Sequence, residues 1–326
     1  MISTKHNSHI EKNRKNPRLS LQSEVIGPNT KTIRCLDWDR DRFDIEFGLR
    51  NGTTYNSFLI EGEKIALIDG SHSKFKTRWI DLLSKQINPK EINYLIVNHT
   101  EPDHSGLIGD LLTINPDIKI LASQIALKFL ENQIHNSFIS QVVKSGDELD
   151  LGKNPNNGFH HKLEFISAPN LHWPDTIFSY DHGAGILYTC DAFGLHYCSN
   201  EVFDIEPNIL TPDFRFYYDC LMAPNARSVI QALKRMNKLP QIKTIGVGHG
   251  PILRDNLNLW INYYKEWSSE KDKCDNYAII FYLSSYEYCD RLSQSIAQGI
   301  GKTNTKVELV DLETCDAHEL NGIISE

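Results

Sequence analysis

The segment of residues 98–106, with the sequence N-H-T-E-P-D-H-S-G, constrains this chain more than any other part of it. It follows directly on the apolar residues 94–97, a pattern typical of a buried strand. The segment places two imidazoles and two carboxylates where that strand ends, on His99, Glu101, Asp103 and His104. Such groups need partners when they lie together, and a bound cation supplies them. The pattern therefore predicts a metal-binding loop.

Three more residues of metal-ligand type, His172, Asp191 and His249, each lie just beyond a predicted strand. Those strands are residues 162–167, 185–189 and 244–247. Functional side chains are commonly built on loops at the edge of a rigid sheet. With the first segment they make four histidines and three carboxylates, which suits two metal ions with a bridging carboxylate better than one ion. Imidazoles mixed with carboxylates favour iron or manganese over a thiolate-type metal site.

The composition excludes several classes of function. A formal net charge of −8 leaves no basic surface for nucleic acid, so we expect no nucleic-acid partner. The seven cysteines are scattered and form no C-x-x-C motif, which predicts neither a zinc–thiolate site nor a disulfide framework and suits a reducing cytoplasm. No apolar run approaches the roughly 18 residues that span a bilayer, and no signal peptide is evident, so we expect a soluble, cytoplasmic protein without an integral membrane segment.

The pattern along the chain predicts four parts. Residues 1–30 are polar and are expected to form a disordered tail. In residues 31–268, predicted strands alternate with amphipathic helices, and the first strand is at residues 43–49. This pattern predicts two packed sheets with helices outside, an αββα sandwich of the α/β (α+β) class. Residues 269–276 have the composition of a linker. Residues 277–326 show the first βαβ of a doubly wound sheet, which we expect to be incomplete because such a domain usually takes roughly 100 to 150 residues.

The motifs in this order resemble the metallo-β-lactamase superfamily, whose hydrolases typically carry H-x-H-x-D-H and bind zinc. Here the motif is H-x-E-x-D-H, with Glu101 in place of the second histidine, and this substitution resembles the flavodiiron proteins. Those proteins join a lactamase-like diiron domain to a flavodoxin-like domain. The surroundings L-H-W-P-D-T, Y-T-C-D-A-F-G and G-H-G-P also fit, while D-W-D-R-D-R-F-D-I-E-F-G-L and G-T-T-Y-N-S-F-L-I resemble the cyanobacterial, photosynthetic branch. The resemblance covers residues 31–326.

This resemblance implies a role for each candidate ligand. One iron would be bound by His99, Glu101 and His172. The other iron would be bound by Asp103, His104 and His249. Asp191 would bridge the two, which leaves no catalytic residue beyond the metal ligands themselves.

The resemblance also implies an FMN site, with the loop after the first flavodoxin-like strand holding the phosphate. Ser284 and Ser285 match the expected donors. Glu287 stands where the family leads us to expect glycine, and Cys289 where serine or threonine is usual. A carboxylate beside a phosphate is unfavourable, and the loss of glycine restricts the turn. The expected cofactors are therefore two iron ions and FMN, with the FMN loop departing from the family pattern.

The function implied is that of an oxidoreductase that reduces dioxygen to water and acts as an electron sink in photosynthetic electron transport. Nitric oxide reduction is the near alternative, because the ligand set does not separate the two gases. The family further implies a head-to-tail homodimer and a donor linked to NAD(P)H or ferredoxin. A lactamase-fold hydrolase using metal-bound hydroxide, and a truncated metal-binding fragment without electron supply, are the other readings.

The remaining histidines are expected to have plainer roles. His196 is either a packed or surface residue or a part of the pocket wall that donates protons. The others are expected at the surface: His135, His160, His161 and His182. Trp173, next to a candidate ligand, is expected to shape the pocket.

Overall fold

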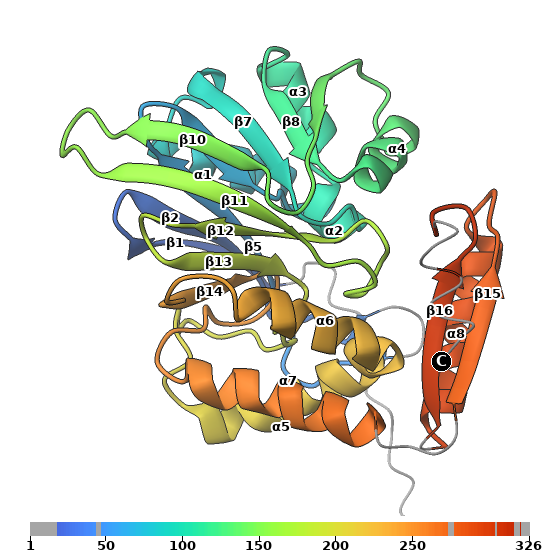
Figure 1. Ribbon diagram of the computed structural model, residues 1–326. Helices are drawn as coiled ribbons and strands as arrows, with labels where there is room; N and C mark the ends of the chain where they lie inside the picture. Colours follow the sequence, from blue (N-terminus) through green and yellow to red (C-terminus); the bar gives the residue numbers. More distant parts are fainter. Residues whose placement is uncertain (1–17, 44–46, 273–276, 304, 316–319, 321–326) are drawn as a thin grey trace, which may run out of the picture.

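The computed structural model describes residues 18–43, 47–272, 277–303, 305–315 and 320. Two β-sheets pack face to face, and helices cover both outer faces (Figure 1). This arrangement confirms the predicted αββα sandwich.

The first sheet has seven strands in the order β1-β2-β5-β6-β7-β8-β9. Neighbours from β1 to β6 are antiparallel, and those from β6 to β9 are parallel. Its strands are β1 (Leu19–Gly27), β2 (Thr30–Asp37), β5 (Thr53–Glu61), β6 (Ile65–Ile68), β7 (Ile92–Val97), β8 (Lys119–Ala122) and β9 (Ile139–Val142).

The second sheet has five strands in the order β10-β11-β12-β13-β14 and is antiparallel except for the last pair, which is parallel. Its strands are β10 (Glu148–Lys153), β11 (His160–Ser167), β12 (Ile177–Asp181), β13 (Ile186–Cys190) and β14 (Thr244–Val247). A two-stranded ribbon, β3 (Arg42–Phe43) with β4 (Phe47–Gly48), lies outside both sheets.

Three apolar layers hold the sandwich together. Between the sheets, Phe58 and Ile96 of the first sheet pack with Phe165, Ile186 and Tyr188 of the second, all of them buried. The outer face of the first sheet is covered by α1 (Lys76–Gln86), α3 (Ile108–Ile114) and α4 (Gln124–Gln133). The outer face of the second sheet is covered by α5 (Pro207–Tyr217), α6 (Ala226–Met236) and α7 (Leu257–Asp272).

Short helical segments complete the sandwich. They are the 3₁₀ segments η1 (Ser73–Phe75), η2 (Pro89–Glu91) and η4 (Ala223–Asn225), the π-helical segment η3 (Tyr218–Met222) and the one-turn helix α2 (Pro102–Ser105).

The C-terminal unit is a βαβ made of β15 (Tyr277–Tyr282), α8 (Tyr288–Gly301) and β16 (Lys306–Asp311), with the two strands parallel. It lies to one side of the sandwich (Figure 1). Nη1 of Arg227 in α6 donates a hydrogen bond of 3.0 Å to Oε2 of Glu308 in β16. This bond joins the C-terminal unit to the helices of the second outer layer.

Three expectations about the chain were wrong. Residues 19–27, expected in a disordered tail, form β1, because the strand pairs along its length with β2 and leaves its polar side chains in solvent. Phe43 pairs with Phe47 across the β3–β4 ribbon, where one continuous strand was predicted. Helix α7 continues to Asp272 and so takes in the first half of the predicted linker. Residues 1–17, 44–46, 273–276, 316–319 and 321–326 lie outside the described residues.

Candidate metal centre

The loop after β7 carries four of the candidate ligands and leads directly into α2. Pro102 occupies the start of α2, where its missing N–H costs no helical hydrogen bond. Oγ of Ser105 donates a hydrogen bond of 2.8 Å to the carbonyl oxygen of Thr100, which closes the loop on itself. The N–H of Gly70 donates a bond of 2.8 Å to the carbonyl oxygen of His104 and ties α2 to the segment after β6.

The other three candidates come from the second sheet. Asp191 directly follows β13 and His249 lies two residues after β14, so the carboxyl ends of these parallel neighbours bring both to one edge. His172 lies in the connection between β11 and β12. Nδ2 of Asn56 in β5 donates bonds of 2.9 Å to the carbonyl oxygens of Val247 and Gly250. The loop with His249 is thereby fixed to the first sheet.

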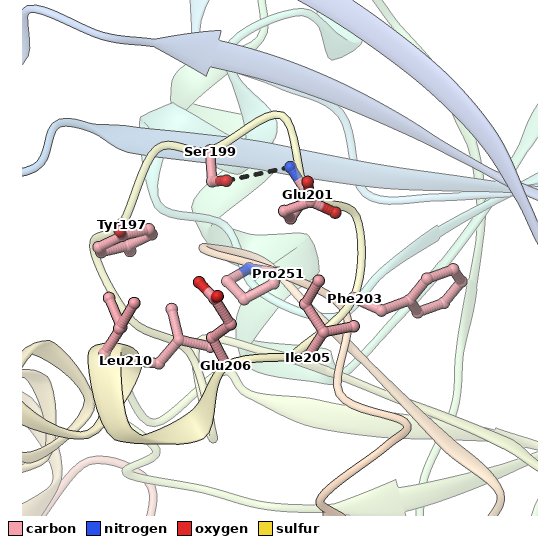
Figure 2. Close-up of a pocket in the computed structure, with 9 residues that line it drawn as sticks. Tyr197, Ser199, Glu201, Phe203, Ile205, Glu206, Leu210 and Pro251 are labelled. Atoms are coloured by element: carbon pink, nitrogen blue, oxygen red, sulfur yellow. Dashed lines mark hydrogen bonds between the residues drawn. The ribbon is translucent and has the colours of Figure 1, made fainter.

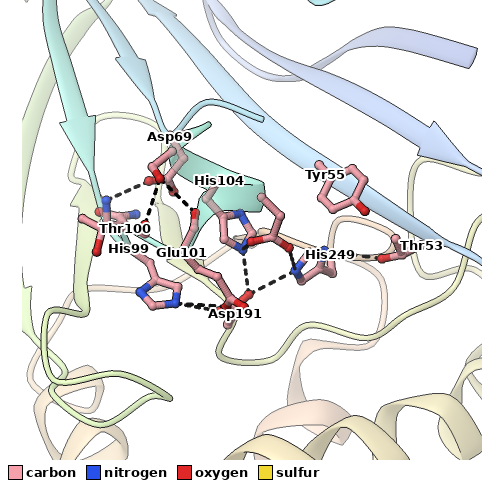
Figure 3. A network of polar contacts seen from close by, with 12 residues as sticks. Thr53, Tyr55, Asp69, His99, Thr100, Glu101, His104, Asp191 and His249 are labelled. Atoms are coloured by element: carbon pink, nitrogen blue, oxygen red, sulfur yellow. Dashed lines mark hydrogen bonds and ion pairs between the residues drawn. The ribbon is translucent and has the colours of Figure 1, made fainter. Parts of the chain in front are cut away.

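The structure brings all seven predicted ligands together, in two groups that meet at Asp191. Figure 3 shows His99, Glu101, His104 and His249 around Asp191. The first group contains His99, Glu101 and His172. Nε2 of His172 lies 3.0 Å from Oε2 of Glu101, and Nε2 of His99 lies 3.4 Å from the same oxygen. Both imidazole nitrogens lie 3.3 Å from Oδ2 of Asp191.

The second group contains Asp103, His104 and His249. Its imidazoles face the other oxygen of the shared carboxylate, since Nε2 of His104 lies 3.0 Å and Nε2 of His249 lies 3.3 Å from Oδ1 of Asp191. Asp103 completes the group, with Oδ1 at 3.5 Å from Nε2 of His104 and Oδ2 at 3.3 Å from Nε2 of His249. Each oxygen of Asp191 therefore belongs to one group.

These distances fit two metal ions. Ligand atoms that lie about 2.1 Å from one ion and at right angles to each other are about 3 Å apart. Within the described part of the chain, several buried ligand atoms also have no hydrogen-bond partner: Nε2 of His99 and of His249, both carboxylate oxygens of Asp103 and Oδ2 of Asp191. Unpartnered buried polar atoms are costly, and metal coordination would satisfy all of them.

The charges of the site balance one another. Burial by itself would lower the pKa of His172, but the neighbouring carboxylates of Asp191 and Glu101 raise it to about 10. His249 behaves in the same way through Asp103 and Asp191, and its pKa is also about 10. Burial would raise the pKa of Asp191, yet the surrounding histidines hold it well below its ordinary value. Glu101 and Asp103 likewise have lowered pKa values, so the three carboxylates are anionic at neutral pH.

Comparison with known proteins shows the family to which the chain belongs. The family model described as ODP family beta lactamase matches residues 53–250. The solved structure of the metal-soaked flavodiiron core from Synechocystis sp. superposes with a TM-score of 0.84 at 33% identity, over 95% of this chain and 76% of that one. The chain belongs to the flavodiiron protein family. Rubredoxin oxygen:oxidoreductase from Desulfovibrio gigas is a more distant flavodiiron relative, with a TM-score of 0.72 and 27% identity over 94% of this chain and 75% of that one.

Among curated relatives, diflavin flavoprotein A 1 of Synechocystis sp. is 54% identical over 307 residues. The match covers 94% of this chain and 52% of the relative. This flavodiiron chain therefore spans about half the length of the curated relatives it matches. None of the helices in its described part is both long enough and apolar enough to cross a lipid bilayer.

A cleft of about 770 Å³ gives access to the candidate metal centre. Glu101 and Asp103 line it together with Phe43, His72 and Trp173, and residues of the C-terminal unit line its other side. The ring of Trp173 also packs perpendicular to His99, with ring centres 5.0 Å apart, so it shapes the site as predicted.

A second hollow, beside Pro251 and lined by Tyr197, Leu210 and Glu206 (Figure 2), has a volume of about 30 Å³, enough for one or two water molecules.

The predicted phosphate loop joins β15 to α8. Ser284 is half-buried, with an unpartnered Oγ among the described residues, and Ser285 is exposed. Glu287 is the N-cap of α8 and has φ = 63°, a left-handed conformation that favours glycine. Its side chain makes no capping hydrogen bond. The backbone thus has the shape expected with glycine, while the residue there is a glutamate.

The other histidines follow the expectations with one exception. His196 is buried and packed: Nδ1 lies 2.8 Å from Oγ1 of Thr53, and its ring centre is 4.8 Å from that of His249. His135, His160 and His182 are exposed. The surface prediction for His161 was wrong, because this residue is fully buried and its Nδ1 lies 2.6 Å from Oδ2 of Asp181 on the neighbouring strand.

Sequence reasoning quoted Asp175 in a motif but gave it no role, and it passed over His72. Asp175 is buried and hydrogen-bonded to His99. His72 lines the cleft, and its Nδ1 accepts a hydrogen bond of 3.2 Å from the backbone N–H of Lys74. A carboxylate placed three residues after a histidine ligand was the one available signal for Asp175. Its contact with His99 depends on the hydrogen bond of 3.0 Å from the N–H of Ile177 to the carbonyl oxygen of Asn98, which joins the start of β12 to the loop after β7.

Proposed function

We propose that this chain is an oxidoreductase of the flavodiiron type that reduces dioxygen to water at a non-haem pair of iron ions. The observation that carries the proposal is the position of Asp191, whose two oxygens each face a separate group of imidazole and carboxylate ligands. A carboxylate shared in this way is typical of sites that hold two ions at once. The printed name of the Desulfovibrio gigas relative, an oxygen oxidoreductase, supports the choice of reaction.

In this proposal His99, Glu101 and His172 hold one iron, Asp103, His104 and His249 hold the other, and Asp191 contacts both. The pair of irons would supply redox chemistry that takes up electrons and passes them to dioxygen. The protein contributes the anionic carboxylates that offset the metal charge, because three carboxylates balance three positive charges of two divalent ions. Four histidines with neutral rings in the loaded site complete the ligand set without adding charge.

The residues that line the cleft determine how the gas reaches the metal ligands and which group can donate a hydrogen bond there. Phe43 and Trp173 give the mouth of the site an apolar wall, which suits a small apolar gas. Burial, followed by the charge of Lys74, lowers the pKa of His72, so this histidine is neutral near pH 7. Its Nδ1 accepts from the backbone of Lys74, which leaves its own proton on Nε2. His72 can therefore offer a hydrogen bond to a group in the cleft.

The proposal also includes the source of the electrons. The family resemblance supports FMN as the immediate donor, held by Ser284 and Ser285 in a head-to-tail homodimer, and a source linked to NAD(P)H or ferredoxin. The resemblance to the photosynthetic branch of the family supports a role as an electron sink in photosynthetic electron transport, and the 54% identity to a diflavin flavoprotein of Synechocystis sp. agrees with that branch. A reducing cytoplasmic location is supported by the cysteine pattern, since the seven cysteines are scattered and form no C-x-x-C motif.

The test is oxygen uptake by the iron-loaded, chemically reduced chain in an oxygen electrode, beside Asp191→Asn. We expect uptake by the parent protein that ends in water without accumulated peroxide, and loss of at least about 100-fold in the variant. A filled diiron site that consumes no oxygen would contradict the proposal. Faster consumption of nitric oxide than of oxygen would assign the nitric oxide reaction instead, and zinc with esterase activity would assign a hydrolase.

A further inference from the structure

We infer that Asp175 is a positioning residue that makes the two metal positions unequal, so that the first group binds its ion more tightly than the second. The inference rests on the proposed two-metal centre and concerns how this chain divides the binding energy between the groups. The inference follows from the groups that contact Nδ1 of the histidine ligands, on the side of each ring opposite Nε2.

Behind His99 stands a carboxylate. Nδ1 of His99 lies 3.0 Å from Oδ1 and 3.2 Å from Oδ2 of Asp175, and both side chains are fully buried. The carboxylate is itself fixed, because the backbone N–H and the hydroxyl of Thr100 donate bonds of 2.8 Å and 2.7 Å to Oδ2. Oγ of Ser123 donates a further bond of 2.8 Å to the carbonyl oxygen of Asp175. Such a fixed acceptor holds the proton on Nδ1 and leaves the lone pair of Nε2 directed at the first group.

Among the described residues, no carboxylate is hydrogen-bonded to Nδ1 of an imidazole in the second group. The buried carboxylate of Asp69 lies near both His104 and His99, and its charge acts on both. Nδ1 of His249 lies 2.6 Å from the carbonyl oxygen of Thr54, a neutral acceptor. Nδ1 of His104 is buried and has no hydrogen-bond partner among the described residues.

This difference has a direct consequence for metal binding. A carboxylate that accepts from Nδ1 makes the imidazole a stronger ligand through Nε2 and adds negative charge near the ion. In the first group, Nδ1 of His99 contacts a carboxylate, and Glu101 is itself a charged ligand. In the second group, Nδ1 of His249 contacts a neutral carbonyl oxygen, and Nδ1 of His104 has no hydrogen-bond partner among the described residues. We therefore assign the tighter of two binding steps to the position of His99, Glu101 and His172.

The experiment is a titration of the metal-depleted full chain with Co²⁺ against a competing chelator, which resolves two steps. Asp175→Asn keeps the size of the side chain but removes its charge. We expect the tighter step to weaken by about 10- to 100-fold, as is usual when a partner of a ligating histidine is lost, and the weaker step to change by less than about three-fold. The readout is two separate affinities, which a general loss of folding would lower together.

Asp181→Asn is the matched control, because it removes the charge from another buried carboxylate that lies 2.6 Å from a histidine, His161, away from the metal ligands. Both steps should stay as in the parent protein. Equal weakening of both steps in Asp175→Asn, or no weakening at all, would overturn the inference. Fewer than two Co²⁺ per parent chain would overturn the two-metal centre itself, and the inference with it.

A second pair of variants tests the assignment without touching Asp175. Glu101→Gln removes a charged ligand from the first group and Asp103→Asn removes one from the second. We expect Glu101→Gln to weaken the tighter step and Asp103→Asn to weaken the other one. The reverse pattern would overturn the inference, whether or not Asp175→Asn folds.

Discussion

Gly248 lies directly against the ring of His104, so that a Cβ atom at position 248 would be 2.7 Å from Cε1 of His104. The same Cβ would lie 3.2 Å from the carbonyl carbon of Cys190, which leaves the new methyl group little room to move away. We therefore expect Gly248→Ala to displace His104 and to weaken metal binding by the second group about 10- to 100-fold. Titration with Co²⁺ measures the effect.

Gly109→Ala is the control for this variant. Gly109 lies inside α3, and the nearest atom that its Cβ would meet is Cγ2 of Ile134 at 3.8 Å, an ordinary contact. This substitution should leave metal affinity unchanged and stabilise the protein by about 0.5 to 1 kcal/mol, since alanine is the better helix residue. Metal binding by Gly248→Ala as tight as in the parent protein would show that Gly248 does not confine His104.

Glu287 is predicted to hinder the FMN loop in two separable ways. Glu287→Gly removes both the carboxylate and the cost of a left-handed backbone, about 1 to 2 kcal/mol for a residue with a side chain. Glu287→Gln removes only the charge. We expect both variants to bind FMN more tightly in a fluorescence titration, and the glycine variant alone to gain stability against urea. Unchanged FMN affinity in both would contradict the assignment of the phosphate to this loop.

Asp290, in the first turn of α8, is predicted to make the stability of the protein pH-dependent. Burial raises its pKa above the ordinary value of 3.8, and hydrogen bonds from Tyr282 and Gln294 only partly oppose this. The folded chain therefore keeps a proton that the unfolded chain has already lost, and stability falls as pH rises from about 3.8 through the folded pKa. Asp290→Asn should be more stable than the parent at pH 7 and no more stable at pH 3.

Thermal unfolding at the two pH values tests this, with Glu313→Gln as a control that removes a charge from an exposed carboxylate of the same unit. The control should show no such difference between the two pH values. A stability gain for Asp290→Asn that is equal at both would mean that the ionised carboxylate is not what destabilises the fold.

The clustering of the seven candidate ligands could be foreseen from the sequence because these residues follow strand ends. An apolar strand such as β7 is recognisable from residue type alone, and polar residues just beyond it must lie at a sheet edge. The layering follows from the same strands and from amphipathic helices such as α6, which bury one face. The βαβ of the C-terminal unit was predictable for the same reason.

What escaped prediction depends on pairing between distant residues. Strand β1 is half-exposed and carries no clear alternation, so only its hydrogen bonds to β2 make it a strand. His161 is buried because Asp181 on the adjacent strand supplies its partner, and the sequence does not state which strands are adjacent. Asp175 lies just before β12, and the hydrogen bond from the N–H of Ile177 to the carbonyl oxygen of Asn98 brings it beside His99.

The measurement that tests the account most directly is Mössbauer and EPR spectroscopy of the iron-loaded chain, beside Asp191→Asn. With both oxygens of Asp191 between the two ligand groups, we expect two irons per chain, magnetically coupled, and the EPR signal of a mixed-valence pair after partial reduction. The variant should lose the coupling and bind less iron. A single iron per chain, or two uncoupled irons in the parent protein, would contradict a centre built around Asp191.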